Sequence, residues 1–332
     1  MESITENLPA AIVIAGTVIL TIVVGIVAGP SQILNSIVTG GMWALLAVGL
    51  ALVFGVMNVP HFAHGESFMV GAYAAYFVFN PINRALRENP NPVLGTVAPF
   101  LAILAAGVAG LVLGVILERL LFYPLRVRTK KGWVMNAFLL TVGISFMLTN
   151  GTNLVLGPNF RGISRYWDVP PLRILGVAMA ADRVVALFIA LISIGALWFF
   201  LRRTRIGRAI RAVSQDELGA QMMGINLNFI FPLTFALATA MAAISGASLL
   251  FMFQAYPTVG LQPLYMAWYV VMMAGLGNVV GAIVGGFIVA VLQTATQQFF
   301  GISWADVIPT VVMIIVLLIV PQGIFGSKIR SS

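Results

Sequence analysis

The sequence has no cysteine and very little charge. The absence of cysteine excludes disulfide bonds and thiolate metal ligands. Only 8% of the 332 residues are charged and 60% are hydrophobic, whereas a soluble domain is about 25% charged and about 45–50% apolar. Because so few charges do not coat a soluble surface, a soluble enzyme, a nucleic-acid-binding module and a disordered linker are excluded. We predict an integral membrane protein.

The usual motifs of nucleotide binding and catalysis are also missing. A P-loop needs a lysine directly after a glycine-rich turn, and none of the three lysines follows one. The pattern His61-x-x-His64-x-Glu66 offers three possible metal ligands, but no further histidine and no cysteine exists to complete a zinc site. Two histidines and ten acids provide no credible Ser-His-Asp arrangement. We expect no enzyme activity, no metal and no cofactor bound by this chain.

Long apolar runs predict an all-α, polytopic membrane protein. The runs are continuous and near the length of about 20 residues that spans the hydrocarbon core, whereas barrel strands alternate over about ten residues. Acidic Glu2 and Glu6 precede the first run without any basic residue, so we expect a retained helix and not a cleaved signal peptide. The ten predicted segments are approximately 8–28, 33–57, 67–80, 97–117, 134–156, 183–201, 226–251, 265–276, 279–299 and 305–320.

Basic residues between these segments predict the topology. They gather in 118–133, in 202–217 and in the tail at Lys328 and Arg330, and basic loops are retained on the cytoplasmic side. Placing these regions inside makes both termini cytoplasmic. The region 157–183 then lies outside although it carries four arginines, against the rule. Topology accounts for the net charge of +8, so we expect the lipid membrane and no nucleic acid as a partner.

Two segments, 67–80 and 265–276, are short for a membrane span, and each lies beside a polar or glycine-rich break. Comparison of the sequence with itself at an offset of 210 residues matches five of thirteen positions around these breaks, so an ancestral repeat and chance similarity both stay open. Short or broken helices in corresponding halves indicate a transport site. Glu66 either opens the following helix, where a carboxylate suits the helix dipole, or lines a transport path.

The segment 202–225 is the longest cytoplasmic stretch in this topology. It predicts an amphipathic helix with Ile206, Ala209, Ile210 and Val213 on one face. A second short helix is expected from residue 216 to residue 223, with a Ser-x-x-Glu capping box at 214–217 and a stop at Gly224. Either an interfacial helix on anionic lipid or a docking ridge for a cytoplasmic protein fits this pattern.

Four motifs in order carry a resemblance to a known family. His61-Phe-Ala-His-Gly-Glu66, followed by Met69 and Gly71-Ala-Tyr73, is similar to the signature Asn-Phe-Ala-His-Gly-Glu, with histidine in place of the first asparagine. The stretch 204–225, the glycines of 275–282 and the closing Pro-Gln-Gly-Ile-Phe-Gly at 321–326 are the other three. From about residue 33 to residue 326 the sequence resembles the membrane permeases of branched-chain amino acid ABC importers.

This resemblance implies a single transmembrane permease domain over 1–332, with an additional N-terminal helix at 8–28 and a core at 33–326, in the cell inner (plasma) membrane. It implies two separate ATPase subunits that use ATP and Mg, a second and non-identical permease, and an extracytoplasmic binding protein. The residues expected to couple the chain to the ATPases lie in 202–225 and are Arg208, Arg211, Asp216, Glu217, Ala220 and Gly224. The residues expected to line the substrate path are His64, Gly65, Glu66, Gly275, Gly277 and Asn278.

Two alternatives stay open for the substrate and the energy source. A permease of the same family for urea or short amides has the same motifs, because the binding protein does most of the selecting. An ion-coupled secondary transporter needs carboxylates inside the membrane, and only Glu66 and Glu118 come near such a position.

Overall fold

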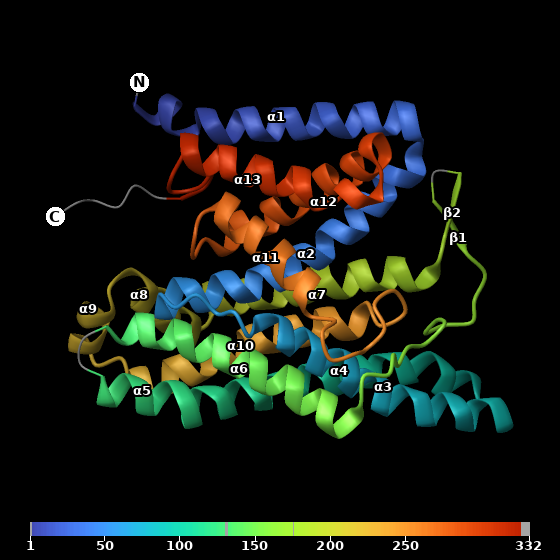
Figure 1. Cartoon of the computed structure of the whole chain (residues 1–332), viewed down its shortest axis with the longest axis horizontal. Coiled ribbons are helices and arrows are strands. Elements are labelled where there is room, and N and C mark those ends of the chain that lie inside the picture. Colours follow the sequence, from blue (N-terminus) through green and yellow to red (C-terminus); the bar gives the residue numbers. More distant parts are fainter. Residues whose placement is uncertain (1, 130–131, 175, 327–332) are drawn as a thin grey trace.

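The protein is a bundle of long helices lying side by side (Figure 1). The computed structural model describes residues 2–129, 132–174 and 176–326. The long helices are α1 (Glu2–Ala28), α2 (Pro30–Met57), α3 (His64–Glu88), α4 (Pro92–Leu117), α6 (Trp133–Leu156), α7 (Ala181–Arg203), α10 (Leu227–Ser248) and α12 (Val279–Phe300). The shorter elements are the π-helix η1 (Glu118–Phe122), α5 (Tyr123–Arg128), strands β1 (Leu172–Ile174) and β2 (Val177–Met179), α8 (Arg205–Gln215), α9 (Glu217–Met222), α11 (Leu261–Ala274), the 3₁₀-helix η2 (Ile302–Trp304) and α13 (Val307–Ile319).

All ten segments predicted from hydropathy are largely helical, which confirms the polytopic all-α prediction. Within the described residues, eight helical stretches are long and apolar enough to cross a membrane. α3 is not among them, and the 14-residue α11 reaches about 21 Å at the usual rise per residue, short of a bilayer core of about 30 Å.

Two boundary predictions were wrong. The segment predicted as short, 67–80, is part of the 25-residue helix α3. Hydropathy missed the two ends of this helix, because its first turn contains buried polar residues and its last turns contain further polar residues. The stretch 118–133, predicted as a loop, is helical as far as Arg128. It stays helical because Glu118, fully buried, pairs with Arg126 at 3.2 Å, while the Arg126 guanidinium stacks 4.3 Å from the centre of the Phe231 ring.

Helix α2 is the centre of the bundle. It packs against α7, α10, α11 and α12, and its side chains from Met42 to Val53 are at most 3% exposed. At one edge of the bundle α1 contacts α2 and α12 (Figure 1). The side chains of Ile12, Ile19 and Ile26 on this helix are exposed. Large apolar side chains on an outer face are expected where lipid is the solvent.

Small residues allow α3, α4 and α10 to approach closely. A Cβ atom at Gly71 of α3 would overlap the backbone of Ala243 in α10, and one at Gly246 of α10 would overlap the backbone of Phe68. Thr239 of α10 donates its hydroxyl proton to the Gly110 carbonyl of α4 at 2.8 Å. Helix pairs in membranes associate through such contacts because lipid offers no hydrophobic driving force between them.

The two ends of the bundle differ. α8, α9 and the end of α5 lie at one end, where α1 begins and α13 ends, and the β1–β2 hairpin lies at the other (Figure 1). The predicted topology makes the α9 end cytoplasmic. Lys130, Lys131, Lys328 and Arg330, on which that prediction partly depends, lie outside the described residues.

We expect Gly71→Ala to destabilise the protein, because the added methyl group forces α3 and α10 apart. Overpacking of this kind costs about 1–3 kcal/mol, so the thermal unfolding midpoint of the purified protein in detergent should fall. Gly195→Ala in α7 is the matched control, since no atom lies within 4 Å of its added Cβ, and its midpoint should stay or rise slightly. Equal midpoints for the two variants would contradict the packing described above.

Candidate functional site

The predicted path residues at the start of α3 are buried in the middle of the bundle. Asn58 ends α2 with a left-handed backbone (φ 54°), and the chain turns back so that α3 begins at His64. The His64 side chain has no exposed surface, and its Nε2 lies 3.1 Å from the Leu46 carbonyl oxygen of α2. Gly49 gives this ring its space, because a Cβ there would come within 3.1 Å of it.

Glu66 contacts a different helix from His64. Its Oε1 accepts hydrogen bonds from the hydroxyl groups of Ser145 and Thr149, both on α6. The three residues of His61-x-x-His64-x-Glu66 therefore do not converge on one point, and the described part of the chain holds no group of three His, Cys, Asp or Glu side chains arranged for a metal. Glu66 is nonetheless buried, and a carboxyl group inside a membrane bundle is a functional candidate.

Gly65 brings the starts of α3 and α11 together. A Cβ at Gly65 would overlap the carbonyl group of Gly260, and one at Gly260 would overlap that of Gly65. The sequence comparison at an offset of 210 residues aligned Gly65 with Gly275, but the residue that Gly65 contacts is the N-cap of α11. Two helices that begin next to each other inside the bundle form the kind of interruption found at transport sites.

The second predicted group, at 275–278, lies at the α9 end. Gly275 (φ 106°) packs against the 322–326 segment, while Gly277 (φ 80°) packs against Gly55 of α2. Asn278 caps α12 by accepting from the Gly281 N–H, and its Nδ2 donates to the Phe325 carbonyl. Gly55 is six residues beyond Gly49, or about 9 Å along α2, so the two predicted groups are not parts of one contact site.

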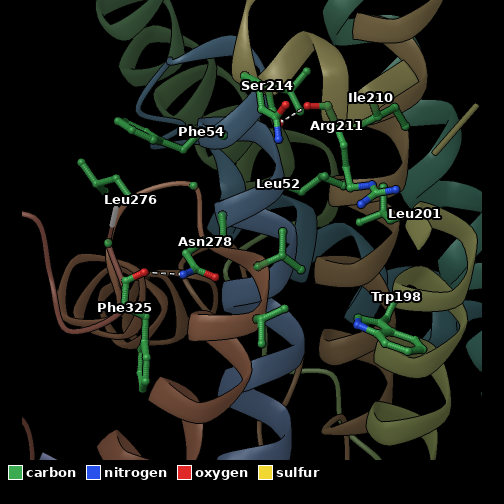
Figure 2. A pocket seen from close by; sticks show the side chains of 18 of the residues that line it. Leu52, Phe54, Trp198, Leu201, Ile210, Arg211, Ser214, Leu276, Asn278 and Phe325 are labelled. Carbon is green, nitrogen blue, oxygen red and sulfur yellow. Dashed lines mark hydrogen bonds between the residues drawn. The ribbon is translucent and has the colours of Figure 1, made fainter. Parts of the chain in front are cut away.

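A cavity of about 550 Å³ opens at this end of the molecule (Figure 2). It joins Gly277 and Asn278, predicted for the path, with Arg211, predicted for coupling. Its other walls come from the end of α2 and the end of α7, including Phe54, Trp198 and Arg202. We call it the α9-end cavity.

A second cavity, of about 370 Å³, opens toward the hairpin end. It lies among the first half of α2, the start of α7, the turn 249–253, α12 and the residues before α13. None of its lining residues was singled out by sequence reasoning, although Gln293 and Asp306 are conspicuous polar residues at or near predicted membrane segments. We call it the hairpin-end cavity. Residues Ala44 to Leu50 of α2, which line neither cavity, are fully buried between the parts of α2 that line each one.

The coupling residues lie on, or directly beside, the two short helices α8 and α9 at the α9 end. Ile210 and Val213 bury the inner face of α8 as predicted, but Ile206 is exposed. The second helix is capped by Asp216, which accepts from the Gly219 N–H at 2.9 Å, so the predicted Ser-x-x-Glu box was wrong. It ends, as predicted, before Gly224, whose φ is 83°.

These residues differ in what they offer to a partner. Arg208, Arg211, Asp216 and Gly224 are exposed, Glu217 is half-buried, and Ala220 faces the protein interior. Sequence reasoning missed the apolar surface of α9, where Leu218 is 69%, Met222 86% and Met223 85% exposed. The sequence pattern that indicates this surface is the spacing of Leu218 and Met222, which are four positions apart and therefore lie on one helix face.

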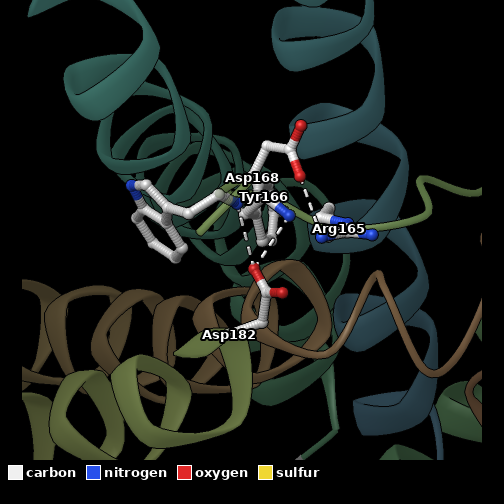
Figure 3. A network of polar contacts seen from close by, with 5 residues as sticks. Arg165, Tyr166, Asp168 and Asp182 are labelled. Carbon is white, nitrogen blue, oxygen red and sulfur yellow. Dashed lines mark hydrogen bonds and ion pairs between the residues drawn. The ribbon is translucent and has the colours of Figure 1, made fainter. Parts of the chain in front are cut away.

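A buried carboxylate contributes to holding the segment between α6 and α7 on the bundle (Figure 3). Asp182 accepts hydrogen bonds from the backbone N–H groups of Tyr166 at 2.8 Å and Trp167 at 3.2 Å. The Tyr166 hydroxyl donates to the Ala247 carbonyl of α10 at 2.7 Å. Burial raises the pKa of this phenol, and the nearby Asp182 charge raises it further, so Tyr166 stays a neutral donor.

Three features define a polytopic membrane transport protein: helices long enough to span a membrane, two other helices (α3 and α11) that begin side by side inside the bundle, and a cavity toward each end. The chain belongs to the permease family described as branched-chain amino acid transport system / permease component, which matches residues 32–317. α1 lies before the matched region. The family consists of transport subunits and not of enzymes.

Individual relatives align over most of their length. The chain is 28% identical over 307 residues to the high-affinity branched-chain amino acid transport system permease protein LivH of Salmonella typhimurium, covering 89% of this chain and 94% of that protein. It is 27% identical over 304 residues to the permease protein BraD of Pseudomonas aeruginosa, covering 89% and 95%. It is 26% identical over 299 residues to the ribose import permease protein RbsC of Escherichia coli, covering 83% and 81%. No solved structure matches the chain significantly.

We expect Asp182→Ala to loosen the segment around Tyr166 and Trp167, because these two backbone N–H groups lose their charged acceptor. A hydrogen bond to a charged group contributes about 1.5–3 kcal/mol, so amide exchange in this segment should accelerate roughly tenfold or more. Hydrogen exchange followed by mass spectrometry measures this rate. The control is Asp168→Ala, which removes an exposed carboxylate paired with Arg165. The same exchange rate in both variants would show that Asp182 does not hold the segment.

Proposed function

We propose that this chain is the membrane-spanning permease subunit of an ABC importer for branched-chain, hydrophobic amino acids in the cell inner membrane. Two ATPase subunits drive it, a second and non-identical permease completes the translocation path, and an extracytoplasmic binding protein delivers the substrate. The names of LivH and BraD support the substrate class. The missing P-loop supports a motor on separate subunits, because this chain lacks the usual loop that holds ATP phosphates.

The observation that carries the proposal is the exposed apolar face of α9. Leu218, Met222 and Met223 project from a helix that Asp216 and Gly224 hold in a defined shape. Exposed apolar side chains next to exposed arginines suit a protein partner with an apolar pocket and an acidic rim. The α9-end cavity begins beside the same element, at Arg211 and Ser214. A displacement of α8 and α9 by a partner is therefore transmitted to this cavity, whose walls include Gly277 and Asn278.

We expect Leu218→Ala combined with Met222→Ala to remove the ATPases from the complex. We place these two side chains at the hot spot of the docking interface, where truncation costs about 2 kcal/mol or more, so co-purified ATPase should fall roughly tenfold or more. Quantitative mass spectrometry of the complex, purified from native membrane through a tag on this chain, measures the loss. Gln221→Ala changes an exposed residue of the same helix that carries no apolar surface and is the control. Unchanged ATPase in the double variant would contradict the docking face, and no ATPase with the native chain would contradict the ABC assignment.

Uptake by the complete system tests the substrate and the energy source together. Cells that express the chain with its partners should accumulate radiolabelled leucine, and accumulation should persist when a protonophore dissipates the ion gradient while ATP is maintained. Urea uptake is measured in parallel. Leucine uptake that stops with the gradient would favour an ion-coupled carrier, and uptake of urea without leucine would favour the short-amide alternative.

A further inference from the structure

The hairpin-end cavity contains one positive and one negative side chain in an otherwise neutral lining. These are Arg183, in the first turn of α7, and Asp306, directly before α13. Five amide side chains, Gln32, Asn35, Gln262, Gln293 and Gln297, lie around the same space. The volume of about 370 Å³ falls in the range of about 300–1,000 Å³ usual for small-molecule sites.

Arg183 is placed in an electrostatically unfavourable position. A cation in the first turn of a helix opposes the helix dipole, and in the described part of the chain Arg183 forms no ion pair that offsets this cost. Its guanidinium donates to the Asn35 side-chain oxygen of α2, which orients it. Because a guanidinium carries five donors, most of its capacity is left for a planar anion such as a carboxylate.

Asp306 is held in place by a chain of amides. Its Oδ1 accepts from Gln293 Nε2 at 3.1 Å and its Oδ2 from Gln262 Nε2 at 3.5 Å. The Gln293 side-chain oxygen accepts from the indole N–H of Trp43 at 3.1 Å, and Gln293 is only 6% exposed. These contacts hold the two Asp306 carboxyl oxygens at a fixed position on the cavity wall, with spare lone pairs that an ammonium group can bind.

Most of the remaining lining is apolar, with Thr39 and Thr294 as its two hydroxyl residues. Val38, Met42, Leu249, Met252 and Phe253 line the same cavity. Methionine and aromatic side chains adapt to branched aliphatic groups of different shape. The cavity therefore combines an anion partner, a cation partner and an aliphatic surface, which are the three features of a branched-chain amino acid.

We propose that the hairpin-end cavity is a binding site for an aliphatic α-amino acid within the permease itself. Arg183 binds the carboxylate, Asp306 binds the ammonium group, and the turn 249–253 with Met42 contacts the side chain. This inference rests on the proposed function and adds to it a site in this chain that recognises the substrate after the binding protein has released it.

The test measures equilibrium binding of radiolabelled leucine to the purified membrane complex without its binding protein, in competition with two analogues. Leucinamide lacks the carboxylate, and 4-methylpentanoate lacks the ammonium group. The native complex should prefer leucine to each analogue. Arg183→Gln should weaken leucine binding about tenfold or more and remove the preference over leucinamide, while Asp306→Asn should remove the preference over 4-methylpentanoate. The matched controls are Arg165→Gln and Asp168→Asn, which change an exposed ion pair that does not line the cavity and should leave both preferences intact.

Several outcomes overturn the proposal. No leucine binding to the native complex at millimolar concentration does so, as do unchanged analogue preferences in both Arg183→Gln and Asp306→Asn. A variant that misfolds weakens the binding of leucine and of both analogues by the same factor, so it leaves the preferences unchanged. This outcome also counts against the assigned roles. Uptake by the complete system separates the two claims: without leucine uptake the proposed function fails, and with uptake but unchanged preferences only this site fails.

Discussion

A chain surrounded by hydrocarbon must satisfy most of its polar groups internally, and this constraint explains three of the polar contacts between its segments. Glu118 pairs with Arg126, Asp182 accepts two backbone N–H groups, and Gln293 bridges Trp43 and Asp306. Each of these contacts joins two different helices, or a helix and a loop. The few polar side chains therefore fix the places where helices meet, while the many apolar ones fill the space between.

The same constraint organises the two ends of the bundle around α2. Its middle is closed, with His64 against the Leu46 carbonyl and with the Ala238 carbonyl against Gly49. Toward each end α2 instead borders a cavity, one lined by the start of α7 and one lined by α8. A closed layer between two cavities is the arrangement that alternating access requires, and α3 and α11, which begin together at Gly65 and Gly260, adjoin this layer.

Much of the fold was predictable because hydropathy over about 20 residues is a local property. All ten segments, the short α11 and the stop at Gly224 follow from local sequence. The errors occurred where tertiary contacts stabilise polar helical turns. α3 extends over a buried His64 and Glu66, and helix continues through Glu118 because Arg126 and Phe231 complete its environment. A polar residue in an isolated sequence predicts a loop, whereas the same residue with a partner is compatible with a helix.

The sequence by itself determined that this protein lies in the membrane, that it is built of helices, and which segment projects from one end as two short helices. Only the tertiary structure decided which residues meet: Glu66 with α6 and not with His64, Gly65 with Gly260 and not near Gly275, and Arg183 and Asp306 around one cavity. The reason is physical. In lipid both the inner and the outer face of a helix are apolar, so the periodicity that marks the buried face of a soluble helix is weak, and side-chain partners are set by shape and by the need to pair polar groups.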